Sequence, residues 1–271
     1  TTAAPAAQTE AAKGEETKAP ETEAKAEDAK AEDTKAETEA AKDGAASGEK
    51  HLVGVAMPTK DLQRWNQDGS NMKAELEAAG YEVDLQYASN DVQTQVSQVE
   101  NMISNGCELL VIASIDGSSL GEPLGQAKEA GIPVISYDRL LMNSDAVTYY
   151  ATFDNYMVGQ KQGEYLVEAL GLEENDGPFN IEMFTGDPAD NNCNFFFGGA
   201  MDVLQPYIDS GKLVVKSGQT TFEQVATANW DSEKAQNRMD TIIAGNYSDG
   251  TVLNAVLCSN DSTALGVENA L

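Results

Sequence analysis

Short apolar runs rich in β-branched residues alternate along the chain with longer stretches in which apolar residues recur at helical spacing. The short runs have the length of strands, and the longer stretches have the length of helices. This alternation is typical of parallel sheets whose strands are joined by crossover helices. The first series predicts strands at 52–57, 81–87, 109–115, 132–137 and 147–152, and helices at 61–79, 91–104, 118–130 and 155–170.

A polar segment at 173–178 separates this series from a second one. The second series predicts strands at 179–184, 213–216 and 252–258, and helices at 196–207, 232–243 and from 262 onward. Most of the predicted helices begin near Asp or Ser and end close to Gly, as helix termini prefer. Two series predict two α/β lobes, an N-terminal lobe at 51–153 and a C-terminal lobe at 154–271. Three strands are few for a sheet flanked by helices, so we expect the second lobe to be incomplete.

Residues 1–50 contain no Val, Ile, Leu, Met, Phe, Trp, Tyr or Cys. Ordering a backbone costs about 1–2 kcal/mol per residue, and this Ala/Glu/Lys-rich segment has no apolar surface to bury in return. We therefore expect residues 1–50 to form a disordered tether outside the fold. Because the chain begins with this tether and without Met, we also expect an export or lipid-anchoring segment upstream of residue 1.

Composition narrows the function classes. The chain has 17 basic and 45 acidic residues and a net charge of −28, so nucleic acid and anionic membrane surfaces are not expected partners. With His51 as the only histidine, most His-based acid–base mechanisms are excluded. The three cysteines are too widely spaced for a zinc site or a disulfide framework. The acidic segment 173–177 has Pro178 where a calcium loop needs an oxygen ligand. We expect no metal and no cofactor.

Polar side chains gather in the segments that directly follow predicted strands, which is where open α/β sheets bind ligands. Two of the three arginines, Arg64 and Arg139, fall in these segments. A guanidinium presents a planar set of donors that suits hydroxyl oxygens, and Asp138 could hold the neighbouring Arg139 in place. The two tryptophans, Trp65 and Trp230, lie outside the predicted strands. An indole face packs well on the C–H face of a sugar ring.

Together these groups predict a site for a small, uncharged, polyhydroxylated ligand. Each also has an ordinary structural alternative. Trp65 could lie on the apolar face of a helix, and Arg139 could form an exposed ion pair with Asp138. Asn192 and Asn260 could be helix N-caps, a role that does not exclude ligand binding.

Eight motifs occur in one order along the chain. They are R-W at 64–65, Q-x-E-N-M-I at 98–103, L-V-I-A-S-I-D-G at 110–117, Y-D-R at 137–139, F-D-N at 153–155, P-x-D-N-N at 188–192, P-Y-I-D-S-G-K at 206–212 and S-N-D-S-T-A-L-G at 259–266. With these motifs, the chain from about residue 53 to residue 271 resembles the periplasmic type I sugar-binding proteins. The resemblance is to the xylose-binding and multiple-monosaccharide-binding branch that serves ABC importers.

The resemblance implies a two-lobed periplasmic binding protein type I fold, with parallel sheets flanked by helices and a monosaccharide between the lobes. The family continues beyond the last of these motifs, which implies that the chain is truncated at its C-terminus. The sugar contacts that the resemblance implies are Lys60, Arg64, Trp65, Asp138, Arg139, Asn192, Trp230 and Asn260.

The same resemblance implies a monomeric binding protein without enzymatic activity. It would capture a pentose or hexose in the periplasm, or at the extracellular face of the membrane, and deliver it to an ABC transporter permease. A membrane chemoreceptor or sensor is a further expected partner.

The alternatives are a sugar-sensing surface receptor and a regulator-like core without transport. A transcription regulator needs a helix-turn-helix, and residues 1–50 have no apolar residues with which to build one. A glycosidase needs a facing pair of carboxyl groups of which one is protonated, whereas Asp138 lies beside Arg139, whose charge favours the ionised carboxylate. A tethered adhesin is the alternative that makes no use of the predicted site.

Overall fold

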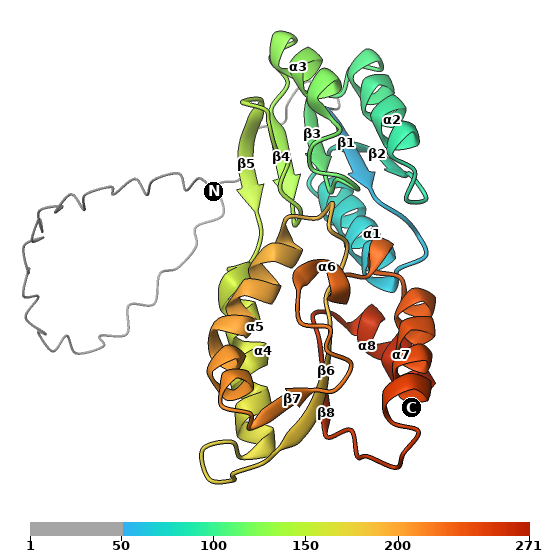
Figure 1. The fold of residues 1–271 in the computed structure, drawn as a ribbon. Helices are drawn as coiled ribbons and strands as arrows, with labels where there is room; N and C mark the ends of the chain where they lie inside the picture. The colour runs from blue at the N-terminus through green and yellow to red at the C-terminus, as the bar shows by residue number, and fades with distance from the viewer. Residues whose placement is uncertain (1–50) are drawn as a thin grey trace, which may run out of the picture. The chain divides into compact units, whose positions relative to one another are not determined.

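The computed structural model describes residues 51–271, which form two parallel sheets flanked by helices (Figure 1). The prediction of a tether at residues 1–50 lies outside the described residues. The first sheet has the strand order β2-β1-β3-β4-β5. Its elements are β1 (Leu52–Met57), α1 (Gln63–Ala78), β2 (Glu82–Tyr87), α2 (Val92–Ser104), β3 (Leu109–Ile112), α3 (Gly121–Glu129), β4 (Val134–Tyr137) and β5 (Val147–Ala151).

The second sheet has the strand order β7-β6-β8. Its strands are also parallel, with Ile181 of β6 opposite Val215 on one side and Ala255 on the other. The elements of this lobe are α4 (Asn155–Leu170), β6 (Phe179–Phe184), α5 (Asn192–Asp209), β7 (Leu213–Val215), α6 (Phe222–Val225), η1 (Ala228–Trp230), α7 (Ser232–Asn246), β8 (Ala255–Cys258) and α8 (Asp261–Ala270).

Helices cover both faces of the central strands of each sheet, and the side chains of a strand point alternately to the two faces. Edge strand β5 is mostly exposed. In the first sheet, Ala56 and Ile112 pack with the apolar side chains of α2 and α3, whereas Val55 and Val111 pack on the other face with Trp65 of α1. The second sheet repeats this arrangement, with one cluster beneath α4 and α5 and another beneath α7 and α8. These are the α/β lobes that the alternating pattern predicts, and the predicted fold class is confirmed. The predicted lobe boundary lies in the connection between β5 and α4 and stays a prediction.

Several predicted boundaries were wrong by two or more residues, among them the start of α3 at Gly121 and the start of β8 at Ala255. Three further cases concern α1, α5 and β3. Helix α1 begins two residues later than predicted, because Asp61 accepts a hydrogen bond from Thr59 and does not cap the helix. Helix α5 begins four residues earlier, at Asn192. Strand β3 ends three residues earlier than predicted, at Ile112, because the side chain of buried Gln95 bonds the backbone of the segment that follows the strand. Within residues 51–271, no helix combines the length and the apolar character that a membrane crossing requires.

Helices α4 and α5 lie side by side and approach closely at glycines (Figure 1). A Cβ atom on Gly159 of α4 would collide with the backbone carbonyl oxygen of Phe196, and a Cβ atom on Gly199 of α5 would collide with that of Tyr156. The obstructing atoms belong to backbone, so a larger residue can be accommodated only by moving one helix. Since α5 begins at Asn192, its position also sets that of the loop before it.

We expect Gly159→Ala to destabilise the protein by about 1–3 kcal/mol, because the added methyl group separates α4 from α5. Urea unfolding of the variant checks this value. The matched control is Gly125→Ala on the exposed side of α3, where an added Cβ has no neighbour within 4 Å. That change is expected to be neutral or to stabilise by up to ~1 kcal/mol. Equal effects at the two positions would contradict the close-packing argument.

Candidate functional site

A cavity of about 520 Å³ collects seven of the eight predicted contacts. Its walls come from both lobes, including the segments that follow β1, β4, β6 and β8. This is the edge at which the carboxyl ends of parallel strands present their loops. The predicted residues on its walls are Arg64, Trp65, Asp138, Arg139, Asn192, Trp230 and Asn260.

Lys60 is the predicted contact that does not line this cavity. Its side chain is exposed, and its ammonium nitrogen lies 5.0 Å from the centroid of the Tyr87 ring. Its backbone carbonyl accepts a hydrogen bond from Asn66. The role of Lys60 as a sugar contact stays a prediction.

Arg64 and Asp138 form an ion pair on the cavity wall. Arg64 Nη1 lies 3.0 Å from Asp138 Oδ2, and Arg64 Nη2 lies 2.6 Å from Asp68 Oδ2. Burial alone would lower the pKa of Arg64, but the negative charges of Asp138 and Asp68 outweigh burial and raise it. Asp138 has a left-handed backbone (φ 60°), and its carbonyl oxygen accepts hydrogen bonds from Tyr150, Thr152 and Asn192.

Arg139 forms an ion pair with Asp190. The prediction that Asp138 holds Arg139 in place was therefore wrong. The alternative, an exposed ion pair between Arg139 and Asp138, was also wrong. The residue is 5% exposed, and its Nε lies 3.0 Å from Asp190 Oδ2. Its Nη1 donates to the carbonyl oxygens of Ser114 and Ile115, at 3.0 and 3.4 Å. Burial raises the pKa of Asp190, although the positive charge of Arg139 acts in the opposite direction.

The two tryptophans form parts of the cavity wall. Trp65 is 2% exposed and packs in the core beneath α1 while it also lines the cavity. Its ring lies 4.1 Å from the Arg64 guanidinium carbon and 5.1 Å from that of Arg139. Trp230 is also buried, and its indole N–H donates to Asp190 Oδ2 at 3.2 Å. Trp65 was expected either in the core, on the apolar face of a helix, or in the binding site. Its side chain is in both places, since it packs in the core and also lines the cavity.

The two predicted asparagines have different local roles. Asn192 is the first residue of α5 rather than its N-cap, so the capping alternative was wrong for this residue. Its Oδ1 accepts from Asn155 at 2.9 Å, and its Nδ2 donates to the carbonyl of Asp138 at 3.1 Å. Asn260 does cap α8, and its Oδ1 accepts from the backbone N–H of Thr263 at 3.0 Å.

The predicted contacts left out twelve of the residues that line this cavity, and three of these are Phe153, Asn155 and Asp190. Asp190 lies in the loop after a predicted strand, two residues before Asn192, so the strand pattern did identify its loop. Nothing in the sequence indicated that the Asp190 side chain is buried. Phe153 is 73% exposed and Asn155 is buried, in the segment where the chain leaves β5 and enters α4. Phe153 and Asn155 lie where the chain passes from one lobe to the other. That position could have indicated them as candidates for a site between the lobes.

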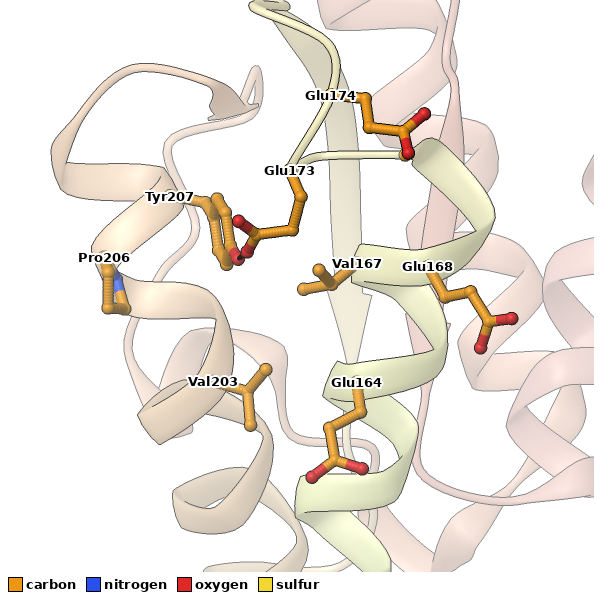
Figure 2. Close-up of a pocket in the computed structure, with 9 residues that line it drawn as sticks. Glu164, Val167, Glu168, Glu173, Glu174, Val203, Pro206 and Tyr207 are labelled. Atoms are coloured by element: carbon orange, nitrogen blue, oxygen red, sulfur yellow. Dashed lines mark hydrogen bonds between the residues drawn. The ribbon is translucent and has the colours of Figure 1, made fainter.

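A second hollow of about 630 Å³ lies beside α4 and α5 and contains none of the predicted contacts. Figure 2 shows that its side chains come from these two helices and from the turn after α4. Four of them are glutamates, which as ionised groups only accept hydrogen bonds. The hydroxyl of Tyr207 is already donated to Glu173. The residues that line it are Glu164, Val167, Glu168, Gly171, Glu173, Glu174, Val203, Pro206 and Tyr207.

Two further observations concern metals and thiols. In the described part of the chain, no group of three or more His, Cys, Asp or Glu side chains is arranged to hold a metal ion. The three cysteines are free, and burial raises the pKa of Cys107 to about 11. The side chains that line the cavity offer hydrogen bonds, charges and aromatic surface.

Comparison with known proteins gives a consistent set of matches. A family model for the periplasmic binding protein domain matches residues 53–271. The chain is 52% identical over 227 residues to the multiple sugar-binding periplasmic receptor ChvE of Rhizobium radiobacter, a match that covers 84% of this chain and 64% of the receptor. It is 35% identical to the D-xylose-binding periplasmic protein of Escherichia coli (strain K12), with the same coverage. The chain thus spans a little under two thirds of the length of these curated relatives.

Among solved structures, an ABC transporter solute binding protein from Clostridium phytofermentans with bound beta-D-glucose is 77% identical to this chain. The TM-score is 0.80, and the match covers 81% of this chain and 68% of that protein. A carbohydrate transporter solute binding protein from Chloroflexus aurantiacus, in complex with D-glucose, is 33% identical with a TM-score of 0.71. That match covers 82% of this chain and 69% of the other.

We expect Asn192→Leu to lower the free energy of unfolding by about 1–3 kcal/mol, because it leaves one N–H of the buried Asn155 amide without its acceptor and removes the donor to the Asp138 carbonyl. Urea unfolding measures the loss. Asn191→Leu is the matched control, since the Asn191 side chain makes no capping bond to α5 and the same exchange there should stay within about 0.5 kcal/mol. A loss of the same size in both variants would show that the Asn192 amide does not link these segments.

Proposed function

Because this chain belongs to the periplasmic binding protein family, we propose that it is a substrate-binding protein that captures a pentose or hexose monosaccharide between its lobes and delivers it to an ABC importer. The observation that carries the proposal is the cavity in which Arg64, Arg139, Trp65 and Trp230 meet. These four groups come from three separate parts of the sequence and from both lobes. Their convergence matches the chemistry of a sugar ring, which has polar hydroxyls at its edge and C–H faces.

The cavity supports a neutral ligand rather than an ion. Its two guanidinium groups are already paired with carboxylates, Arg64 with Asp138 and Arg139 with Asp190. Asp261 adds a third carboxylate to the wall, so the wall carries no unpaired cation that would attract an anion, and it offers a ligand a set of hydrogen-bond donors and acceptors. A volume of about 520 Å³ lies within the range of small-molecule sites, about 300–1,000 Å³.

Similar proteins support the choice of sugar class. The relatives named above include a D-xylose-binding protein, a multiple sugar-binding receptor and a protein with bound beta-D-glucose. A pentose and a hexose in the pyranose form differ by one hydroxymethyl group, and one cavity with room for that group suits both. We propose D-glucose and D-xylose as the first sugars to test.

Binding in this proposal breaks no bond, and its energy comes from contacts made when the two lobes close on the sugar. A dissociation constant near 1 µM corresponds to about −8.2 kcal/mol. Several hydrogen bonds and two aromatic walls are sufficient for a free energy of that size.

The proposal extends to location and partners. We place the protein in the periplasm or at the extracellular face of the membrane, with the permease of an ABC importer as its partner. A lipid anchor, a monomeric state and a chemoreceptor or sensor partner stay predictions.

We expect D-glucose or D-xylose to raise the melting temperature of the 271-residue chain. At a sugar concentration about 1,000 times the dissociation constant, the stabilisation is about 4.1 kcal/mol, or roughly 8–16 °C. Differential scanning fluorimetry with a panel of monosaccharides measures the shift, and L-glucose is the control of identical composition. The absence of any shift across the D-sugar panel would refute the proposed function.

We expect Arg139→Ala to weaken sugar binding at least tenfold, or about 1.4 kcal/mol, because it removes donors from the wall and leaves Asp190 unpaired. Isothermal titration calorimetry with the sugar selected by the melting experiment checks this. Lys128→Ala removes an exposed cation that pairs with Asp145, and it should leave the affinity unchanged. An unaltered affinity in Arg139→Ala would remove Arg139 from the site.

A further inference from the structure

We propose that Asp190 is a positioning residue that fixes two walls of the cavity at once, the Arg139 guanidinium and the Trp230 indole. The inference rests on the proposed function for its binding test, but the contacts that support it are all made within the protein. Sequence reasoning gave the supporting role to Asp138, the neighbour of Arg139. The structure gives the contacts of that role to Asp190.

One carboxylate oxygen of Asp190 holds both groups. Oδ2 lies 3.0 Å from Arg139 Nε and accepts the Trp230 indole N–H at 3.2 Å. The other oxygen, Oδ1, accepts the backbone N–H of Asn192 at 3.0 Å, which fixes the carboxylate against the start of α5. Asp190 is 4% exposed, so these contacts are largely shielded from water. The contact with Arg139 is an ion pair whose Nε–H does not point at the oxygen well enough to form a hydrogen bond, whereas the contacts with Trp230 and Asn192 are hydrogen bonds to a charged acceptor. Water competes little for any of the three at this depth.

The contact also joins the two lobes. Arg139 follows β4 of the first sheet, whereas Asp190 follows β6 of the second. The side chain of Asp190 therefore connects a guanidinium of one lobe to an indole of its own lobe across the cavity. A change in the angle between the lobes would have to break or stretch this ion pair.

Asp190 also decides which donor of Arg139 is left for a ligand. Nε faces Asp190, and Nη1 donates to two backbone carbonyls. Among the described residues, Nη2 has no hydrogen-bond acceptor, and the side chain lines the cavity. The Asp190 carboxylate thus orients the planar guanidinium of Arg139. Its Nε and Nη1 contact the protein, and its Nη2 amino group remains for a sugar oxygen.

The binding test is a double-mutant cycle on the full 271-residue chain with D-glucose as the probe. Asp190→Asn keeps the shape of the side chain and an oxygen acceptor for the indole, but it removes the charge that holds Arg139. We expect a loss of affinity of at least tenfold in the wild-type background and of less than threefold in the Arg139→Gln background. Asp145→Asn, which removes an exposed carboxylate paired with Lys128, should not change the affinity. Independent, additive losses would overturn the proposal.

A second readout needs no sugar. The chain has two tryptophans, so a ¹H–¹⁵N spectrum contains two indole N–H signals, which Trp65→Phe assigns. Asp190→Asn should move the Trp230 signal upfield because the charged acceptor is lost, whereas Asp145→Asn should move neither signal. An unmoved Trp230 signal would refute the positioning role. If Asp190→Asn does not fold, Asp190→Glu tests the same contact, because its longer side chain displaces the carboxylate and should shift the same signal.

The two readouts separate this inference from the proposed function. If the wild-type chain binds none of the sugars, the proposed function fails and the indole signals still decide the role of Asp190. If the wild-type chain binds sugar and the cycle is additive, the proposed function stands and the positioning role fails.

Discussion

Parallel strand pairing in both sheets directs the carboxyl ends of β1, β4, β6 and β8 toward one cavity. In a parallel sheet every strand must be followed by a crossover before the next begins, so the loops at one edge are free of the short hairpins that antiparallel strands would place there. Those loops can therefore carry polar side chains without disturbing the buried strands. The position of the candidate site is a consequence of the strand direction, and the apolar clusters on both faces of each sheet keep that direction fixed.

The polar side chains of the cavity are held by one another before any ligand arrives. Asn155 donates to Asn192, and Asn192 donates to the carbonyl of Asp138, whose carboxylate pairs with Arg64. A wall in which most side chains already have a partner loses little conformational freedom on binding, because these side chains are fixed in advance. Most polar groups in such a network must have a hydrogen-bond partner, because a buried polar group without one lowers the stability of the folded protein. The cavity combines rigidity with hydrogen-bonding capacity for that reason.

The strand and helix pattern was readable from the sequence because buried parallel strands are short apolar runs and their helices have a regular apolar face. The segments after the strands, which carry Asp138 and Asn260, followed from the same pattern, whereas Arg64 lies in the first turn of α1 and not in a loop. The partner of Arg139 did not follow, because adjacency in sequence does not give the direction of side chains. Asp138 has a left-handed backbone and its carboxylate pairs with Arg64, whereas Arg139 pairs with a residue 51 positions away, which no local pattern could identify.

The placement of both indoles on the cavity wall has an optical consequence. The protein has no tryptophan outside the cavity, so its long-wavelength ultraviolet emission arises entirely from the two rings that border this space. One ring lies near two guanidinium groups, and the other donates its N–H to a carboxylate. Because an excited indole responds to nearby charge, the intrinsic emission of the molecule is a direct reporter of the state of this cavity and carries no background from the rest of the fold.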